Sequence, residues 1–385
     1  MASKLGKTNV VQIAKRSFAA QPATKALFSP DIQSGTSYNK VKVVSVNETS
    51  PIARISVAFK AGARYETPDN LGITHVLRSA AGLSTEEFTH FGIIRHVQQA
   101  GGSLYATVDR EGIVYTIEAV RKEIGHVHKF LASVVGKTEF RPWEVSDLTP
   151  RLKYDRLTRP SQVSELRLQI VFFFLAFLTI RLADSIAFKS GGGSGAAASK
   201  FYGGELRKAS SEPLAYVAVA TESASASAKE ALAFAVLKYA LGAGPARRRR
   251  LYLPLLSAFN VNYADSGLFG FVLAASPDKI TPALQASIDV VRGAGIKDAD
   301  IARGKALLKR HLADSFETLD STVDSVVRQA VTTGVVKSLP DLLAEVEAVS
   351  SSDVSAAAGK IKSGKVASAA FGSLQKLPYI DTLLK

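Results

Sequence analysis

The residues whose spacing comes closest to a known chemistry lie in the segment Leu71–Leu83, which reads LGITHVLRSAAGL. In an inverted zinc motif, H-x-x-E-H, two histidines four residues apart project from one helix face onto the metal, and the glutamate is the base for the zinc-bound water. The segment keeps the first histidine as His75, but Arg78 occupies the position of the base and Ser79 that of the second histidine. The spacing of these residues matches a metal site, but two of their side chains do not.

These replacements predict that the site is inactive. Arginine stays protonated in proteins and would repel a dication, and serine is a poor ligand for zinc. Two carboxylates further along the chain, Asp147 and Asp155, cannot rescue a site that already lacks a ligand and its base. We therefore expect neither a catalytic residue nor a bound metal here.

Other catalytic and cofactor motifs are missing from the sequence. The chain has no cysteine, which excludes a thiol nucleophile and any thiolate metal site. It contains no G-x-S-x-G nucleophile elbow, and no dinucleotide-binding fingerprint follows its first predicted strand. We expect no cofactor.

The elements around the motif alternate between strands and helices. Apolar and β-branched residues alternate in four segments that we predict as strands, 41–46, 53–59, 103–108 and 113–117. Helical periodicity predicts three helices, at 71–83, 85–100 and 121–135. This order predicts an α+β layer, in which helices pack on one face of a mostly antiparallel sheet.

The same order returns in the second half of the chain. GGSLYATVDREGIVYTIEA from Gly101 and LLSAFNVNYADSGLFGFVLA from Leu255 share one plan, a strand, a turn with an acid and a glycine, and a second strand with aromatic residues. This duplication predicts two similar domains in one chain, the second ending in further helices and a strand at 366–371. Between the halves, SGGGSGAAAS (190–199) is typical of a flexible linker.

The net charge of +14 is concentrated in two places. Residues 1–30 hold five basic and no acidic residues, and an arginine run at 247–250 adds four more charges. The remaining balance is ordinary and no aromatic residues interleave with it, so we expect no nucleic-acid binding. The composition of 1–30 is typical of a mitochondrial presequence, and the alternative is a disordered basic tail. Arg16, Phe18 and Ala19 fit a matrix cleavage pattern, which predicts a presequence of residues 1–18.

An apolar run at 170–180, IVFFFLAFLTI, is too short to cross a membrane. At a 1.5 Å rise per residue it covers roughly 17 Å, about half of the hydrocarbon core. A buried strand or core helix is favoured over an interfacial anchor, and we expect no transmembrane helix.

Several motifs in the same order carry a family resemblance: GARYETPDNLGITHVLRSAA, GGSLYATVDREGIVYTIEAV, FRPWEVSDL, FYGGELRK, ALGAGP and NVNYADSGLFGF. By these motifs the chain resembles the pitrilysin/insulinase-type zinc peptidase family, in the group that contains the core protein 2 subunits of mitochondrial respiratory complex III and the subunits of mitochondrial processing peptidase. The resemblance covers most of 40–165 and continues from Ala198 to the C-terminus.

The resemblance implies two homologous peptidase-like domains, at 38–189 and 200–385, joined by the linker. It implies a non-catalytic structural subunit of the ubiquinol–cytochrome c reductase complex, paired with core protein 1 near cytochrome b. Such a subunit lies on the matrix side of the mitochondrial inner membrane, is peripheral to it, and supports assembly and respiratory electron transport. The family's metal motif maps onto His75, Arg78 and Ser79, where it is degenerate. The alternative is a presequence-binding, non-catalytic subunit of a processing peptidase.

Two junctions depart from the family pattern. After Arg167 the family continues with helices and a strand that complete the first domain, whereas this chain passes through the apolar run to the linker. After Ala246 a loop and helix are replaced by RRRRLYLPLL. Both junctions resemble deletions or misread exon boundaries. The first domain is therefore predicted to be incomplete after about residue 165 and to leave a sheet edge uncovered.

Overall fold

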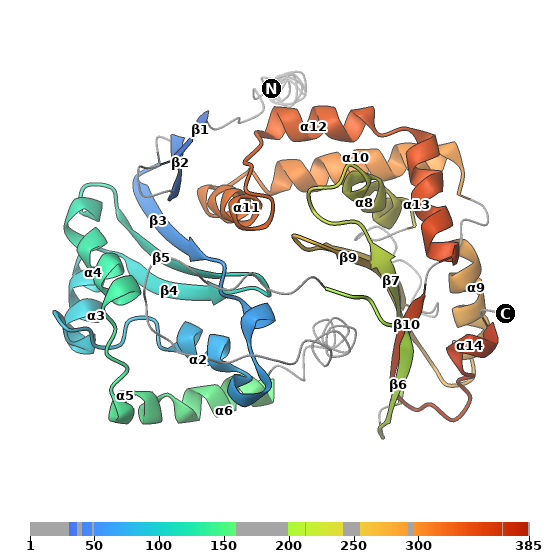
Figure 1. Cartoon of the computed structure of the whole chain (residues 1–385), viewed down its shortest axis with the longest axis horizontal. Helices are drawn as coiled ribbons and strands as arrows, with labels where there is room; N and C mark the ends of the chain where they lie inside the picture. The colour runs from blue at the N-terminus through green and yellow to red at the C-terminus, as the bar shows by residue number, and fades with distance from the viewer. Residues whose placement is uncertain are drawn as a thin grey trace, which may run out of the picture.

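The computed structural model describes eight stretches of the chain, residues 31–36, 41–47, 50–158, 199–211, 213–241, 255–291, 296–363 and 365–383 (Figure 1). The predicted cleavage residues Arg16, Phe18 and Ala19, the apolar run 170–180 and the arginine run 247–250 lie outside the described residues, as does most of the linker. Within the described stretches, each helix is too short or too polar to cross a membrane.

The first half of the chain alternates strands and helices in the predicted order. Its elements are β1 (Asp31–Thr36), β2 (Lys42–Asn47), β3 (Ile52–Phe59), two 3-10 turns (Ala63–Tyr65 and Pro68–Asn70), α2 (Ile73–Ser79), α3 (His90–Gln99), β4 (Ser103–Val108), β5 (Ile113–Val120), α4 (Ile124–Gly136), α5 (Pro142–Asp147) and α6 (Thr149–Thr158).

The first sheet has one apolar and one polar face. Its antiparallel strands lie in the order β3-β5-β4, and β1 and β2 form a separate two-stranded antiparallel sheet. Alternation along the strands places Val57, Leu104 and Ile117 on the same face, where α3 and α4 cover them with side chains such as Val97 and Phe130. The first hydrophobic core lies between this face and the two helices.

Two helices of the first half are shorter than the sequence predicts. α2 lies between Gly72 and Gly82, whose φ angles of 90° and 94° are left-handed values that interrupt a regular helix. Ahead of α3, Thr85 forms an isolated bridge with Thr138 instead of a helical turn. The helix begins only after Thr89, whose hydroxyl accepts a hydrogen bond from the main-chain N–H of the third helical residue. The predicted boundaries of these two helices were wrong, because left-handed glycines and a capping side chain set where a helix begins and ends, and hydrophobic periodicity does not reveal them.

The second half repeats the pattern and continues with more helices. Its elements are β6 (Gly204–Ala209), β7 (Ala215–Ser223), α8 (Glu230–Ala240), β8 (Leu255–Asn262), β9 (Gly267–Ala275), α9 (Ile280–Val291), α10 (Asp298–Asp314), α11 (Leu319–Thr332), α12 (Leu339–Ala348), α13 (Ser351–Ser363), β10 (Val366–Gly372) and α14 (Ile380–Leu383).

The second core is larger than the first and lies between its sheet and the helices around α8. Phe234 and Leu237 of α8, Phe269 and Phe271 of β9, and Leu284 of α9 are each at most 1% exposed and pack in one cluster. Truncating a buried phenylalanine of this kind costs about 3–5 kcal/mol. This core makes the second half the more extensively packed part of the described chain.

The two halves share one order of elements, and the predicted α+β class with helices on one face of mostly antiparallel sheets is confirmed. Besides the number of helices, they differ in one strand of the sheet. The second sheet has the order β6-β10-β7-β9-β8, with β10 parallel to β6 and antiparallel to β7. The corresponding strands of the first half, β2 and β3, belong to separate sheets, and no described strand lies between them. The domain limits at 38–189 and 200–385 stay predictions.

Candidate functional site

Helix α2 carries the three residues of the predicted metal motif. Glu66 fixes the start of this helix, because its carboxylate accepts hydrogen bonds at 3.0 Å from the N–H groups of Gly72 and Thr74. A carboxylate at a helix N-terminus also stabilises the positive end of the helix dipole. The fixed start sets which way His75 and Arg78 project.

His75 and Arg78 meet a carboxylate from α6. A guanidinium nitrogen of Arg78, Nη2, lies 2.8 Å from Oδ2 of Asp155 and 3.4 Å from Nδ1 of His75. The same carboxylate oxygen lies 3.8 Å from Nε2 of His75. The Arg78 guanidinium thus supplies the positive charge at the place where the imidazole and the carboxylate converge.

Ser79 does not join this cluster through its hydroxyl. Its Oγ donates to the main-chain carbonyl oxygen of His75 at 3.1 Å, within the same helix, and the residue is 5% exposed. A serine that bonds back to its own helix offers no ligand to a metal. The structure therefore brings together two of the three motif residues and adds Asp155, which the sequence reasoning had considered and set aside.

The cluster is an ion pair and not a metal centre. A catalytic zinc needs three protein ligands and an open position, and this arrangement offers one imidazole and one carboxylate with a permanent cation between them. Within the described part of the chain, no group of three or more histidine, cysteine, aspartate or glutamate side chains could hold a metal ion. The donor set does not fit zinc, so the cluster connects α2 to α6 without supplying a base or an activated water.

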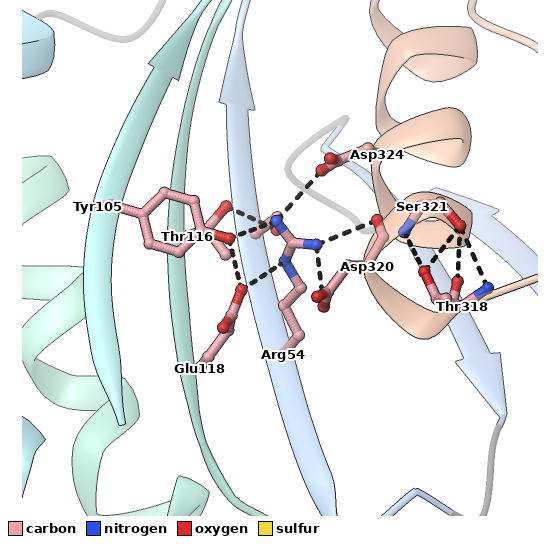
Figure 2. A network of polar contacts seen from close by, with 9 residues as sticks. Arg54, Tyr105, Thr116, Glu118, Thr318, Asp320, Ser321 and Asp324 are labelled. Carbon is pink, nitrogen blue, oxygen red and sulfur yellow. Dashed lines mark hydrogen bonds and ion pairs between the residues drawn. The ribbon is translucent and has the colours of Figure 1, made fainter. Parts of the chain in front are cut away.

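A second polar cluster joins the two halves of the chain (Figure 2). Arg54 of β3, with a side chain only 4% exposed, lies on the polar face of the first sheet and reaches Glu118 of β5 at 3.3 Å. On the other side it contacts the carboxylates of Asp320 and Asp324 of α11, at 3.4 and 3.2 Å. Burial and a hydrogen bond to Glu118 raise the pKa of Tyr105, which also accepts a hydrogen bond from Arg54 at 2.5 Å. One buried cation therefore connects β3, β4, β5 and α11.

The hairpin turns of the two halves make a further contact. Arg64, in the loop after β3, donates to Asp265 at 2.8 Å and to Glu111 at 3.2 Å. Glu111 also accepts from the main-chain N–H of Ala264 at 2.8 Å. Burial disfavours the charge on Asp265, but hydrogen bonds from Arg64 and from the N–H of Ser199 lower the pKa of this carboxyl to about 2. The turns β4–β5 and β8–β9 are held together by charged hydrogen bonds.

This α+β architecture, with an inverted zinc helix that has lost its base and second histidine, defines a class: non-catalytic proteins built on a zinc peptidase fold. Comparison with protein families agrees, because residues 42–169 match the insulinase family, peptidase family M16. The chain is 30% identical over 429 aligned positions to cytochrome b-c1 complex subunit 2 of Mus musculus, covering 95% of each chain. The human subunit is 29% identical over 409 positions, covering 90% of each.

The chain belongs to the cytochrome b-c1 complex subunit 2 family, a non-catalytic branch of the insulinase-type peptidases. Its likeness to the alpha subunit of the mitochondrial processing peptidase of Solanum tuberosum is weaker, at 24% identity over 416 positions, covering 90% of this chain and 82% of the relative. The alignment with the mouse subunit is longer than the 385 residues of this chain, so the relative holds positions that have no counterpart here.

Proposed function

We propose that this chain is a non-catalytic structural core subunit of the mitochondrial ubiquinol–cytochrome c reductase complex and supports assembly and respiratory electron transport. The observation that carries the proposal is the identity of 30% across 95% of both chains with a protein named as a subunit of the cytochrome b-c1 complex. The Arg78–Asp155 ion pair supports a role without hydrolysis, because it leaves no base and no open metal position.

The proposal places the chain in mitochondria, on the matrix side of the inner membrane and peripheral to it. Core protein 1 and the region of cytochrome b are its proposed partners, in a hetero-oligomeric assembly. The short or polar helices of the described part agree with peripheral binding. We further propose that import removes residues 1–18, so that the mature chain begins at Ala19 after the Arg16 and Phe18 signal.

Complementation tests the proposed function. Cells that lack their own subunit 2 are given this chain, and ubiquinol–cytochrome c reductase activity and the assembled complex on native gels are measured. We expect both to return, and to return equally with His75→Ala, since the imidazole has no catalytic task. Failure of the unchanged chain, while the endogenous subunit restores activity, contradicts the proposal.

The location is tested in the same cells. N-terminal sequencing of the imported chain is expected to start at Ala19, and carbonate at high pH is expected to release the protein from the membrane. A chain that keeps residues 1–18 refutes the cleavage assignment, and resistance to carbonate refutes peripheral binding.

A second candidate is a presequence-binding, non-catalytic subunit of a processing peptidase. The 24% identity to a processing peptidase alpha subunit favours it. Against it, the glycine-containing segment at 242–245 is short for a substrate loop, and it lies outside the described residues. Rescue of presequence cleavage in cells that lack the alpha subunit, without rescue of the reductase, would select this candidate.

A further inference from the structure

The second sheet carries apolar side chains on both of its faces. Alternation along β7 and β9 divides them into two sets. Val217 and Phe271 point into the core that α8, α9 and α13 share, whereas Ala218, Leu268 and Val272 point to the opposite face. Figure 1 shows α9 and α13 on the side of β7 and β10 away from the first sheet, so the opposite face is turned toward the first half.

We call this opposite surface the inner face; it consists of Ala218, Ala220, Leu268 and Val272, with Phe201, Phe259, Val261 and Tyr263 half-buried around them. Ala220 and Leu268 are only 1% and 2% exposed. Within the described residues, the apolar side chains of this cluster come from strands and short connecting segments, and none comes from a helix. A sheet face becomes this dry when another apolar layer packs on it. The described part of the chain does not supply that layer.

One stretch outside the described residues has the composition of such a layer. Residues 159–198 include the apolar run 170–180, which contains four phenylalanines and no charged residue. The other long stretches outside the described residues, 1–30 and 242–254, are rich in basic residues and contain no apolar run of this length. Composition therefore selects the run 170–180.

The end of the same stretch is fixed beside the inner face. The main-chain N–H of Ser199 donates to a carboxylate oxygen of Asp265 at 2.8 Å, in the turn between β8 and β9. Phe201, two residues later, is itself a member of the inner face. Ser199 follows Ile180 by 19 residues, and a flexible chain of that length spans about 24 Å on average. The run 170–180 is therefore tethered within reach of the inner face.

We propose that the apolar run 170–180 packs on the inner face of the second sheet. Its phenylalanine and aliphatic side chains and those of Leu268, Val272 and Phe259 then leave water together, which is the driving force of the contact. The run becomes part of the folded chain and is not available to insert into a membrane. The contact lies within one chain, so it does not depend on the proposed function.

Photocrosslinking of the full chain tests the contact. Phe174, near the middle of the run, is replaced by p-benzoylphenylalanine, and the crosslinked peptides of the irradiated protein are identified by mass spectrometry. We expect crosslinks within one molecule to β7, β8 or β9. The control carries the same photoreactive residue in place of Phe91 of α3, which is 72% exposed, and should give no crosslink to these strands.

A variant of the inner face tests the same contact through protease access. Val261→Asp places a charge in the apolar contact, and chymotrypsin is expected to cleave within 170–180 at least about tenfold faster than in the unchanged chain. Val335→Asp, whose valine is 58% exposed, is the matched control and should leave the cleavage rate unchanged. Circular dichroism verifies that both variants fold. If Val261→Asp unfolds, the crosslinks of the chain with an unchanged inner face decide the question.

Four results would overturn the inference. Crosslinks from position 174 only to residues of the first half would place the run on another surface. Crosslinks between two molecules would make a second copy the partner of the run. Crosslinks to lipid, when vesicles of phosphatidylcholine and cardiolipin are present, would make the run a membrane anchor. Equal cleavage of folded Val261→Asp and the unchanged chain would show that the inner face does not hold the run.

Discussion

Replacing Arg54 tests whether its polar contacts stabilise the joined halves. Arg54→Met keeps a long apolar stem but removes the guanidinium. Glu118 and Tyr105 then lose their cationic partner inside the first half, and the carboxylates of Asp320 and Asp324 lose their link to β3. The second half stays folded around its own core, so the variant weakens one contact surface and not the whole chain.

The size of the effect follows from burial. The Arg54 side chain is 4% exposed and that of Glu118 is 24% exposed, so this pair is largely shielded from water. Breaking a fully buried pair by removing one partner costs about 3–5 kcal/mol. Asp320 and Asp324 are 70% and 68% exposed, and exposed pairs contribute at most about 1 kcal/mol each. Because Glu118 retains some access to solvent, we expect a total loss of about 2–4 kcal/mol.

Urea unfolding followed by circular dichroism measures this loss. The matched control is Arg310→Met, whose arginine is 74% exposed and lies 3.9 Å from Asp314, and which should change the free energy of unfolding by less than about 0.5 kcal/mol. Asp320→Asn should cost less than about 1 kcal/mol. If Arg54→Met is no more destabilising than Arg310→Met, or if Asp320→Asn alone matches it, the assigned role of the buried cation is wrong.

Three further predictions follow from the described geometry. The double variant Arg78→Glu, Ser79→His recreates H-x-x-E-H beside a carboxylate of α6 and is expected to bind one zinc ion in equilibrium dialysis; Ser79→His alone should bind none, because the guanidinium remains. Gly304→Ala places a Cβ 2.8 Å from a main-chain oxygen of α8 and should destabilise by about 1–3 kcal/mol in urea unfolding, whereas Gly125→Ala, with open space around it, should not destabilise. The lowered pKa of Asp265, about 2 against an ordinary 3.8, gives a stabilisation that is complete above pH 3.8 and is lost as the pH falls toward 2; Asp265→Asn should remove this part of the acid dependence, and an unchanged acid profile would contradict the role of its ion pair.

Periodicity in the sequence predicted most of the strands and their alternation with helices. The segment predicted as a final strand, 366–371, is β10, which runs from Val366 to Gly372. Its place between β6 and β7 could not be read from local pattern, because strand pairing joins residues far apart in the chain. Helix ends were misjudged around Gly72 and Gly82, where left-handed backbone and side-chain caps decide the boundaries.

The residue types predicted the chemistry of the candidate site, but they did not predict which residues pair with each other. Residue types alone showed that Arg78 and Ser79 cannot serve a zinc ion. The pairing of Arg78 with Asp155 crosses 77 residues of chain, and the contact of Arg54 with Asp320 crosses 266. The first depends on how two helices pack against each other and the second on how a helix packs against a sheet, and one sequence encodes neither as a local signal.

In the proposed role, this chain holds a respiratory complex together and cuts no peptide. Affinity purification of the tagged chain from gently solubilised mitochondria, followed by mass spectrometry, tests this role. We expect recovery of core protein 1 and cytochrome b in amounts comparable to the tagged chain. Recovery of the catalytic subunit of the processing peptidase, without cytochrome b, would contradict it.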